Sequence, residues 1–184
     1  TYNCISSILQ AEPIVSYEII SGNDSSTGYK KIINLNISNI IFHNNNNKYN
    51  FLMNCNEMVK LSKGKYILFL NNEIKVHKKW LIYLIKLIES DEKIGMVGSK
   101  VVYPNGQLQE AGGIVWNNGE YYNYGRGNNF DMPEYNYVKE VDYISGASIL
   151  IRKMIWEKIG GLDVRYFSSF YGDIDFAFKL RSFG

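Results

Sequence analysis

The sequence predicts an α/β fold in which helices flank a mostly parallel sheet. Short apolar runs, typical of buried strands, alternate with segments whose apolar residues recur at helical spacing. This alternation is the pattern of parallel sheets whose strands are joined by helices. The 184 residues suffice for one domain with a hydrophobic core, and no linker-like segment divides them.

The predicted strands are short apolar segments bounded by turn residues. The clearest is 66–70, because five consecutive apolar residues suit a strand that is buried on both faces. Four further strands are predicted at 15–20, 39–42, 95–103 and 141–152. The last of these is interrupted by Ser145-Gly146-Ala147, where small residues indicate that something approaches closely.

The predicted helices lie between and after these strands, at 4–10, 51–63, 79–90, 153–159 and 173–183. Gly64 and Gly160 follow two of them, and glycine is the favoured residue just beyond a helix end. Residues 107–137 are rich in Gly, Asn and Tyr and are predicted to be irregular.

The composition excludes several classes of protein. The net charge is only +2 and the basic residues are spread along the chain, so a nucleic-acid partner is not expected. Cys4 and Cys55 form no metal-ligand spacing, which favours two reduced thiols in a cytosolic protein. No apolar run reaches the length of a membrane span, and no signal peptide opens the chain.

The first candidate for chemistry is the segment 21–28, which follows the predicted strand 15–20. Its amides and hydroxyls could meet the base or ribose of a nucleotide. The alternative is an ordinary surface turn, which its Gly, Asn, Asp and Ser content also explains. The segment matches neither of the common glycine-rich phosphate-binding motifs.

The second candidate is Asn71-Asn72-Glu73, directly after the strand 66–70. In an open α/β sheet, ligands bind at the carboxyl ends of the strands. A hard cation such as Mg²⁺ or Mn²⁺ needs few protein carboxylates when phosphate and water supply its other oxygen ligands, so one Glu suffices. The alternative is that Glu73 only helps to start the next segment.

The third candidate is Asp173-Ile174-Asp175, at the start of a predicted helix. Negative charge is favoured there, so plain capping explains both residues. The functional interpretation is that one of them takes a proton from a hydroxyl nucleophile. Two residues apart on a helix, they face different directions and are not expected to act as a pair.

The region 107–147 carries aromatic and glycine residues that could contact a sugar. Trp116 and the nearby tyrosines offer flat faces, and the glycines around Arg126 allow close backbone approach. The alternative, that these residues pack a small lid or subdomain, is equally compatible with the pattern.

Several short motifs follow one another in an order and spacing that are specific as a set. They are found at 22–28, 51–56 with 63–66, 71–73, 146–147, 159–163, 171–175 and 179–181. Together they resemble the family 2 glycosyltransferases, inverting enzymes of the Rossmann-like GT-A fold that use nucleotide-diphosphate sugars. Residues 1–3 resemble the end of the family's first strand, and 98–143 is especially similar to bacterial enzymes of O-antigen and surface-polysaccharide assembly.

The resemblance implies a role for each motif. Asp173 would deprotonate the acceptor hydroxyl, and Glu73 would hold a divalent metal, Mn²⁺ or Mg²⁺, beside the diphosphate leaving group. The residues implied to bind substrate are Gly22, Asn23, Asp24, Ser25, Asn56, Asn71, Asn72, Trp116, Arg126, Gly146, Ala147 and Asp175.

The resemblance also implies the partners. The donor would be a nucleotide-diphosphate sugar, with UDP or dTDP as the nucleotide, and the acceptor a glycan or a lipid-linked hydroxyl in cell-envelope polysaccharide biosynthesis. We expect a cytoplasmic protein without a nucleic-acid partner. Peripheral association with the inner face of the membrane stays open.

Three positions depart from the family pattern. Gly172 replaces the Glu that precedes the base, Glu73 replaces the metal-binding Asp, and Ser21 or Gly22 stands where a nucleotide-binding Asp is usual. Because the first strand and the C-terminal part of the family fold are absent, we expect 1–184 to be a single GT-A domain from a longer polypeptide.

Two other functions fit parts of the sequence. Gly172 and the missing nucleotide Asp are compatible with a catalytically inactive GT-A module that binds nucleotide or glycan or acts as a scaffold. A nucleotidyltransferase of similar architecture ranks lower, since the segment 21–28 contains no Arg or Lys to grip phosphate.

Overall fold

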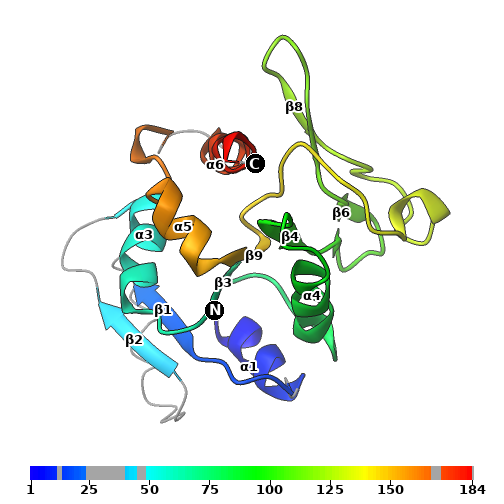
Figure 1. Ribbon diagram of the computed structural model, residues 1–184. Helices are drawn as coiled ribbons and strands as arrows, with labels where there is room; N and C mark the ends of the chain where they lie inside the picture. The colour runs from blue at the N-terminus through cyan, green and yellow to red at the C-terminus, as the bar shows by residue number, and fades with distance from the viewer. Residues whose placement is uncertain (12–13, 24–39, 45–48, 167–170, 184) are drawn as a thin grey trace.

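The computed structural model describes residues 1–11, 14–23, 40–44, 49–166 and 171–183 (Figure 1). The α-helices are α1 (Tyr2–Gln10), α3 (Phe51–Leu61), α4 (Trp80–Glu89), α5 (Lys153–Ile159) and α6 (Tyr171–Ser182). The strands are β1 (Ile19–Asn23), β2 (Ile40–Asn44), β3 (Tyr66–Leu70), β4 (Met96–Gly98), β5 (Val101–Val102), β6 (Leu108–Glu110), β7 (Gly113–Val115), β8 (Tyr121–Asn123) and β9 (Ser148–Arg152). Short 3₁₀ turns η2 (Pro133–Tyr135) and η3 (Val164–Tyr166) complete the described elements.

The central sheet is mixed, so the prediction of a mostly parallel sheet was wrong for the described strands. Its order is β3-β9-β4, and β9 runs antiparallel to both neighbours. The only parallel pairing among the described residues joins β1 to β2. The cause is the connection between β4 and β9, which consists of short strands and loops rather than a helical crossover.

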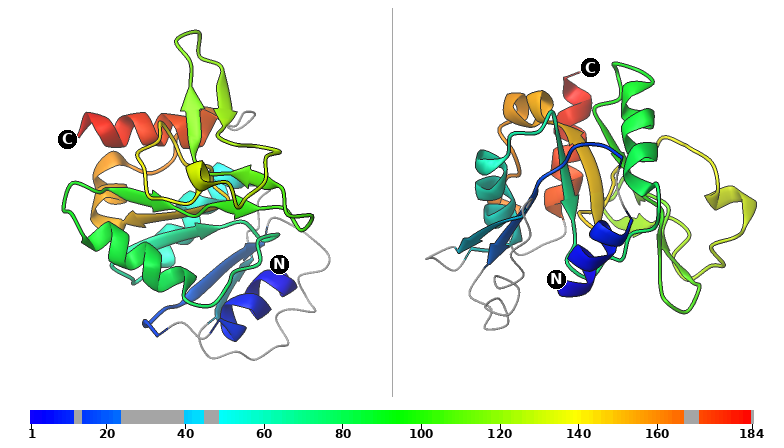
Figure 2. Two further views of the ribbon diagram at one scale, coloured as in Figure 1. Left: turned by 90° about the vertical axis from the view of Figure 1, so that its right-hand side faces the viewer. Right: turned by 90° about the horizontal axis from the view of Figure 1, so that it is seen from below.

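Helices cover both faces of this sheet, as Figures 1 and 2 show. Successive side chains of a strand point to opposite faces. Leu150 of β9 packs with Leu84 and Ile88 of α4, whereas Ile149 and Ile151 pack with residues of α3, α5 and α6. The predicted layer arrangement, a sheet flanked by helices, is therefore observed.

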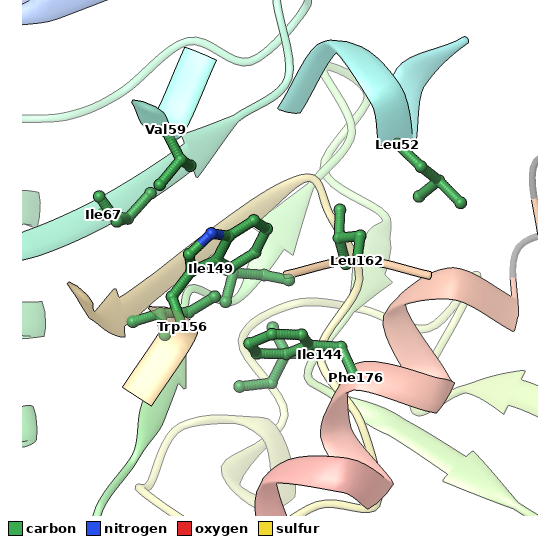
Figure 3. Close-up of a cluster of buried hydrophobic side chains, with 9 residues drawn as sticks. Leu52, Val59, Ile67, Ile144, Ile149, Trp156, Leu162 and Phe176 are labelled. Atoms are coloured by element: carbon green, nitrogen blue, oxygen red, sulfur yellow. The ribbon is translucent and has the colours of Figure 1, made fainter. Parts of the chain in front are cut away.

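The larger core cluster lies between the sheet and α3, α5 and α6 (Figure 3). At its centre Trp156 packs against two other aromatic rings. The ring centroid of Phe69 lies 5.0 Å from that of Trp156, and the centroid of Phe176 lies 5.2 Å away. This aromatic stack supports the first half of α6, which carries the candidate site residues.

Several boundaries differ from the sequence prediction. Helix α1 begins at Tyr2, so residues 2 and 3 are helical and do not end a strand. Strand β1 lies at Ile19–Asn23 rather than 15–20, so the predicted turn 21–28 begins inside a strand. The predicted strand 95–103 divides into β4 and β5 next to Ser99, whose hydroxyl lies 2.9 Å from the hydroxyl of Ser148.

The region predicted to be irregular contains regular structure. Strand β6 pairs with β5, and β7 pairs with β8 in a hairpin that projects beyond the sheet (Figure 1). In the described part of the chain, none of the helices combines the length and the apolar character needed to cross a bilayer.

Candidate active site

Asp173 lies in the first turn of α6 and is held by the backbone of a distant turn. The N–H of Gly146 donates a hydrogen bond of 2.7 Å to Asp173 Oδ2. A Cβ at position 146 would lie 3.3 Å from both carboxylate oxygens and 3.1 Å from Cζ of Phe51. Glycine at 146 therefore allows the backbone to approach the carboxylate closely.

The surroundings of Asp173 change its acidity. It lies beside a small cavity whose other walls are mainly apolar, formed by Phe51, Phe69, Gly146, Ile149, Ile151, Trp156, Leu162 and Phe176. Burial raises the pKa of Asp173 to about 6, against a smaller opposite effect of the Gly146 hydrogen bond. A carboxylate with this pKa is ionised at neutral pH and can accept a proton there.

One short turn brings the second and third candidate motifs together. The carbonyl oxygen of Ala147 accepts a 3.0 Å hydrogen bond from the N–H of Asn71, at the end of β3. The preceding residue, Gly146, donates to Asp173. Asn71 and Asp173 are 102 positions apart in the sequence. They are thus hydrogen-bonded to two adjacent residues, Ala147 and Gly146.

The segment Asn71-Asn72-Glu73 forms a compact turn at the carboxyl end of β3. The side-chain oxygen of Asn71 accepts from the N–H of Glu73 at 3.1 Å, and its carbonyl accepts from Ile74 at 3.0 Å. Asn72 donates to the hydroxyl of Thr1 at 3.2 Å. The turn leaves Glu73 exposed at the edge of the sheet.

Glu73 fits a hard cation that takes most of its ligands from elsewhere. Over the described ranges no three His, Cys, Asp or Glu side chains gather in a way that could hold a metal by themselves. An exposed carboxylate suits a cation that keeps water ligands and shares phosphate oxygens. Glu73 could therefore contribute one carboxylate ligand to such a cation.

Asp175 has different neighbours from Asp173, as the two-residue spacing predicts. It forms an ion pair of 2.7 Å with Lys179. Lys179 also contacts Asp163 at 3.3 Å, and Asp163 pairs with Arg165 at 2.6 Å. The hydrogen bonds from Arg165 are the main cause that lowers the pKa of Asp163. Through this network Asp175 connects α6 to η3.

Asn56 contacts the backbone of Leu162. Its side-chain nitrogen donates to the Leu162 carbonyl at 2.8 Å, and its oxygen accepts from the Leu162 N–H at 2.9 Å. These two bonds join α3 to the chain after α5. The described hydrogen bonds of the Asn56 side chain are therefore structural.

Of the four candidates for nucleotide binding in the segment 21–28, the structure describes Gly22 and Asn23. A side chain at Gly22 would run into the side chain of Asn54, so glycine lets β1 pack against α3. Asn23 is buried and donates to Asn44 of β2 at 3.0 Å. Asp24 and Ser25 lie outside the described residues.

The β7–β8 hairpin places Trp116 near the start of α6. Trp116 is 56% exposed. The hydroxyl of Tyr171 donates to the carbonyl of Gly119 at the hairpin tip, at 3.2 Å, and its ring packs edge-on against Tyr121 at 5.3 Å. The hairpin is thus attached to Tyr171, which precedes Asp173 by two residues in the sequence. Arg126 follows β8 and donates to the hydroxyl of Tyr103 at 3.3 Å.

Two residues that the sequence analysis did not select also belong to this region. Glu110, at the end of β6, is 2% exposed and accepts a hydrogen bond from the hydroxyl of Ser145. Ser145 stands in the interruption that the sequence analysis had identified. No sequence pattern separates Glu110 from the other acidic residues of the chain.

Comparison with known proteins identifies the family of the chain. The model of the family described as "Glycosyl transferase family 2" matches residues 1–158. The chain therefore belongs to this family, and the predicted resemblance is confirmed.

Two curated relatives are similar to most of this chain. The chain is 28% identical over 140 residues to the O-antigen biosynthesis protein RfbC of Myxococcus xanthus, covering 70% of this chain and 10% of that protein. It is 25% identical over 144 residues to the uncharacterized protein y4gI of Sinorhizobium fredii, covering 74% of this chain and 15% of that protein. The matched part thus spans a small fraction of both relatives.

A solved structure with a similar fold is "GalNAc-T7 with UDP, GalNAc and Mn2+", at a TM-score of 0.67 and 11% identity. The similarity covers 96% of this chain and 37% of that one. At this level of identity the likeness shows the fold, which is the GT-A fold with a mixed sheet.

Proposed function

We propose that the chain is an inverting glycosyltransferase. It moves a sugar from a nucleotide-diphosphate donor to a hydroxyl of a glycan or lipid-linked acceptor in polysaccharide biosynthesis. The observation that carries this proposal is the half-buried Asp173 carboxylate, held by the Gly146 N–H beside the end of β3. Membership of the family supports it, and so does the similarity to an O-antigen biosynthesis protein.

In the proposed reaction the acceptor oxygen attacks the anomeric carbon as the bond to the diphosphate breaks. Asp173 takes the hydroxyl proton, and the diphosphate leaves with the bonding electron pair. Attack from the face opposite the leaving group inverts the configuration. Because the pKa of Asp173 is raised to about 6, its carboxylate is a stronger base than an ordinary Asp yet remains ionised at neutral pH.

Glu73 would hold Mn²⁺ or Mg²⁺ at the carboxyl end of β3. When bound, such an ion neutralises the charge that develops on a diphosphate leaving group. The Asn71 side chain fixes the turn that presents Glu73. The similar GT-A structure contains UDP and Mn²⁺, which supports a UDP- or dTDP-sugar donor for this chain.

The remaining candidates divide between donor and acceptor. The end of β1, with Gly22 and Asn23, would lie on the nucleoside side of the site. Trp116 would offer a flat exposed face to the acceptor, next to the start of α6. We propose a cytoplasmic location for the reaction, where nucleotide sugars are available.

A thermal-shift panel with UDP, dTDP, GDP and CMP, each with and without Mn²⁺, tests the donor site. A nucleotide at about 100 times its Kd adds about 2.7 kcal/mol, which raises the Tm of a domain of this size by roughly 5–10 °C. We expect one diphosphate to give this shift only with metal. In Glu73→Ala the metal-dependent part should disappear, because the carboxylate that holds the cation is gone.

Glu92→Ala is the matched control, since Glu92 is also exposed but lies in the turn after α4. The Tm of Glu92→Ala should rise with nucleotide and metal by as much as that of the wild type. An undiminished metal-dependent shift in Glu73→Ala would exclude Glu73 as the ligand. No shift with any nucleotide in the wild type would contradict the donor site itself.

The replacement of the family's Glu by Gly172 has a structural explanation. Gly172 is buried, and a Cβ there would lie 2.8 Å from Cδ2 of Leu52, a core residue of α3. We therefore expect Gly172→Glu to lower the free energy of unfolding by about 1–3 kcal/mol through overpacking, and not to raise the rate of transfer.

The double variant Leu52→Ala/Gly172→Glu tests this explanation. It should be less destabilised than the sum of the two single variants, by about 0.5–3 kcal/mol, because Leu52→Ala makes room for the new side chain. Denaturant unfolding and transfer rates measure both expectations. If Gly172→Glu is as stable as the wild type and transfers faster, Gly172 marks a weakened catalyst instead.

A further inference from the structure

We propose that Glu110 is a positioning residue for Asp173, because it holds Ser145 and thereby fixes the Gly146 N–H that contacts the carboxylate. The inference rests on the function proposed above, in which Asp173 is the base. Glu110 itself needs no contact with substrate for this role.

The hydrogen bonds form a continuous path from Glu110 to Asp173. The Ser145 hydroxyl donates to Glu110 Oε1 and accepts the N–H of Ala147 at 3.4 Å. The Ser145 side chain thus closes the turn in which Gly146 lies. On the other side of the turn, Ala147 accepts from Asn71 at 3.0 Å. The Gly146 N–H is therefore oriented by Glu110 from one side and by β3 from the other.

A carboxylate in the place of Glu110 is costly and is not explained by packing. The residue is 2% exposed, and a buried carboxylate is unfavourable unless hydrogen bonds compensate it. Burial raises the pKa of Glu110, the charge of Asp173 adds to this effect, and Ser145 and Arg126 oppose it. The hydrogen bond from the Ser145 hydroxyl is the described side-chain contact that compensates this cost.

Other titratable groups also face Asp173 from the elements packed around it. Cys55 of α3 has its pKa raised to about 12, first by burial and then by the charge of Asp173. Burial, followed by Glu110, Tyr121 and Asp173, raises the pKa of Tyr143, and Arg126 opposes them. Over the described ranges, Glu110 is the one acidic group joined to Asp173 through the Ser145-Gly146 turn.

The proposal predicts different effects for substitutions that keep and that break the path. Glu110→Gln keeps an oxygen for the Ser145 hydroxyl, so the turn should stay closed and the pKa of Asp173 should stay close to that of the wild type. Glu110→Leu leaves that hydroxyl without its acceptor. Ser145→Ala breaks the path and frees the turn. The Gly146 N–H, which lowers the pKa of Asp173, is then no longer held, and that pKa should rise.

The test is a pH titration of the Gly146 amide signal by NMR in the full chain, together with turnover. In the wild type the signal should follow Asp173 with a midpoint near 6. We expect the wild-type midpoint in Glu110→Gln, and a Gly146 signal that no longer follows Asp173 in Glu110→Leu and in Ser145→Ala. Turnover of Ser145→Ala should drop roughly 10–100-fold in kcat with little change in KM, since the base is misplaced.

Glu120→Gln is the control, because Glu120 is exposed at the tip of the hairpin, and it should titrate like the wild type. A Gly146 signal that follows Asp173 with the wild-type midpoint in folded Glu110→Leu and Ser145→Ala would overturn the proposal, and so would unchanged turnover in Ser145→Ala. If Glu110→Leu does not fold, a Glu110→Gln variant that behaves like Ser145→Ala would also overturn it. The NMR result does not depend on transfer, so an inactive wild type would contradict the proposed function and leave the Glu110 contact to be judged by titration.

Discussion

Asp173→Asn is expected to reduce kcat by roughly 10²–10⁴-fold, the range for loss of a general base. Asn has nearly the same shape and keeps an oxygen for the Gly146 N–H, but it cannot take a proton. Donor affinity should therefore remain, and the loss should appear in kcat. Single-turnover transfer measures the chemical step, and a thermal shift with nucleotide measures donor binding, so the two experiments together separate the rate from the affinity.

The same substitution should stabilise the fold at neutral pH. The pKa of Asp173 is raised from 3.8 to about 6 in the folded chain, so folding favours the protonated form. The stability associated with this proton is fully present below about pH 3.8 and is lost as the pH rises through 6. Asp173→Asn should gain up to about 3 kcal/mol over the wild type near pH 7.5, and almost nothing near pH 4.

Asp175→Asn is the comparison for this prediction. Asp175 pairs with Lys179 and does not share the Gly146 contact. Its replacement should leave kcat within a few fold of the wild type. If Asp173→Asn transfers normally and Asp175→Asn does not, the base is Asp175 and the assignment of Asp173 is wrong.

Phe176→Ala should lower the free energy of unfolding by about 3–5 kcal/mol. Phe176 is 2% exposed and its ring centroid lies 5.2 Å from that of Trp156, so truncation leaves a void in the main core cluster (Figure 3). The void adjoins the cavity beside Asp173. Water that enters it would lower the pKa of Asp173 toward the ordinary value. Denaturant unfolding and the titration of Asp173 measure these effects.

Phe178→Ala provides a matched control on the same helix. Phe178 is 49% exposed, and its truncation should cost less than about 1 kcal/mol and leave Asp173 unchanged. Equal losses of stability in the two variants would show that the aromatic stack does not support α6 as described.

The sequence predicted the elements whose signals are local. Residues 66–70 and 153–159 have the predicted bounds, because a purely apolar run and a helix that ends at glycine leave little choice. Strand direction was not predictable in this way. The pattern of β9 is that of any buried strand, and its antiparallel course depends on the long non-helical connection before it.

The candidate site carries a signal in the sequence only where a motif stands. The expectation that ligands gather at the carboxyl ends of strands pointed to Asn71, and the small residues of the interruption 145–147 pointed to a close approach there. In the structure the Asn71 N–H bonds to Ala147 and the Asp173 carboxylate to the adjacent Gly146. Glu110 was missed, because its importance comes from burial and from a contact with Ser145 that no spacing reveals. Asn56 belongs to a family motif, yet its amide is occupied by the backbone of Leu162.

The pH dependence of donor turnover tests the central claim, that Asp173 is the base, most directly. The measurement is release of nucleoside diphosphate from sugar donors that carry the nucleotide found in the thermal-shift panel, with water as acceptor, in the wild type and in Asp173→Asn. We predict that the wild-type rate rises with pH through a midpoint near 6 and that this rise is absent from the variant. A wild-type rate that is independent of pH through this range, or an equal rate in the variant, would contradict the account.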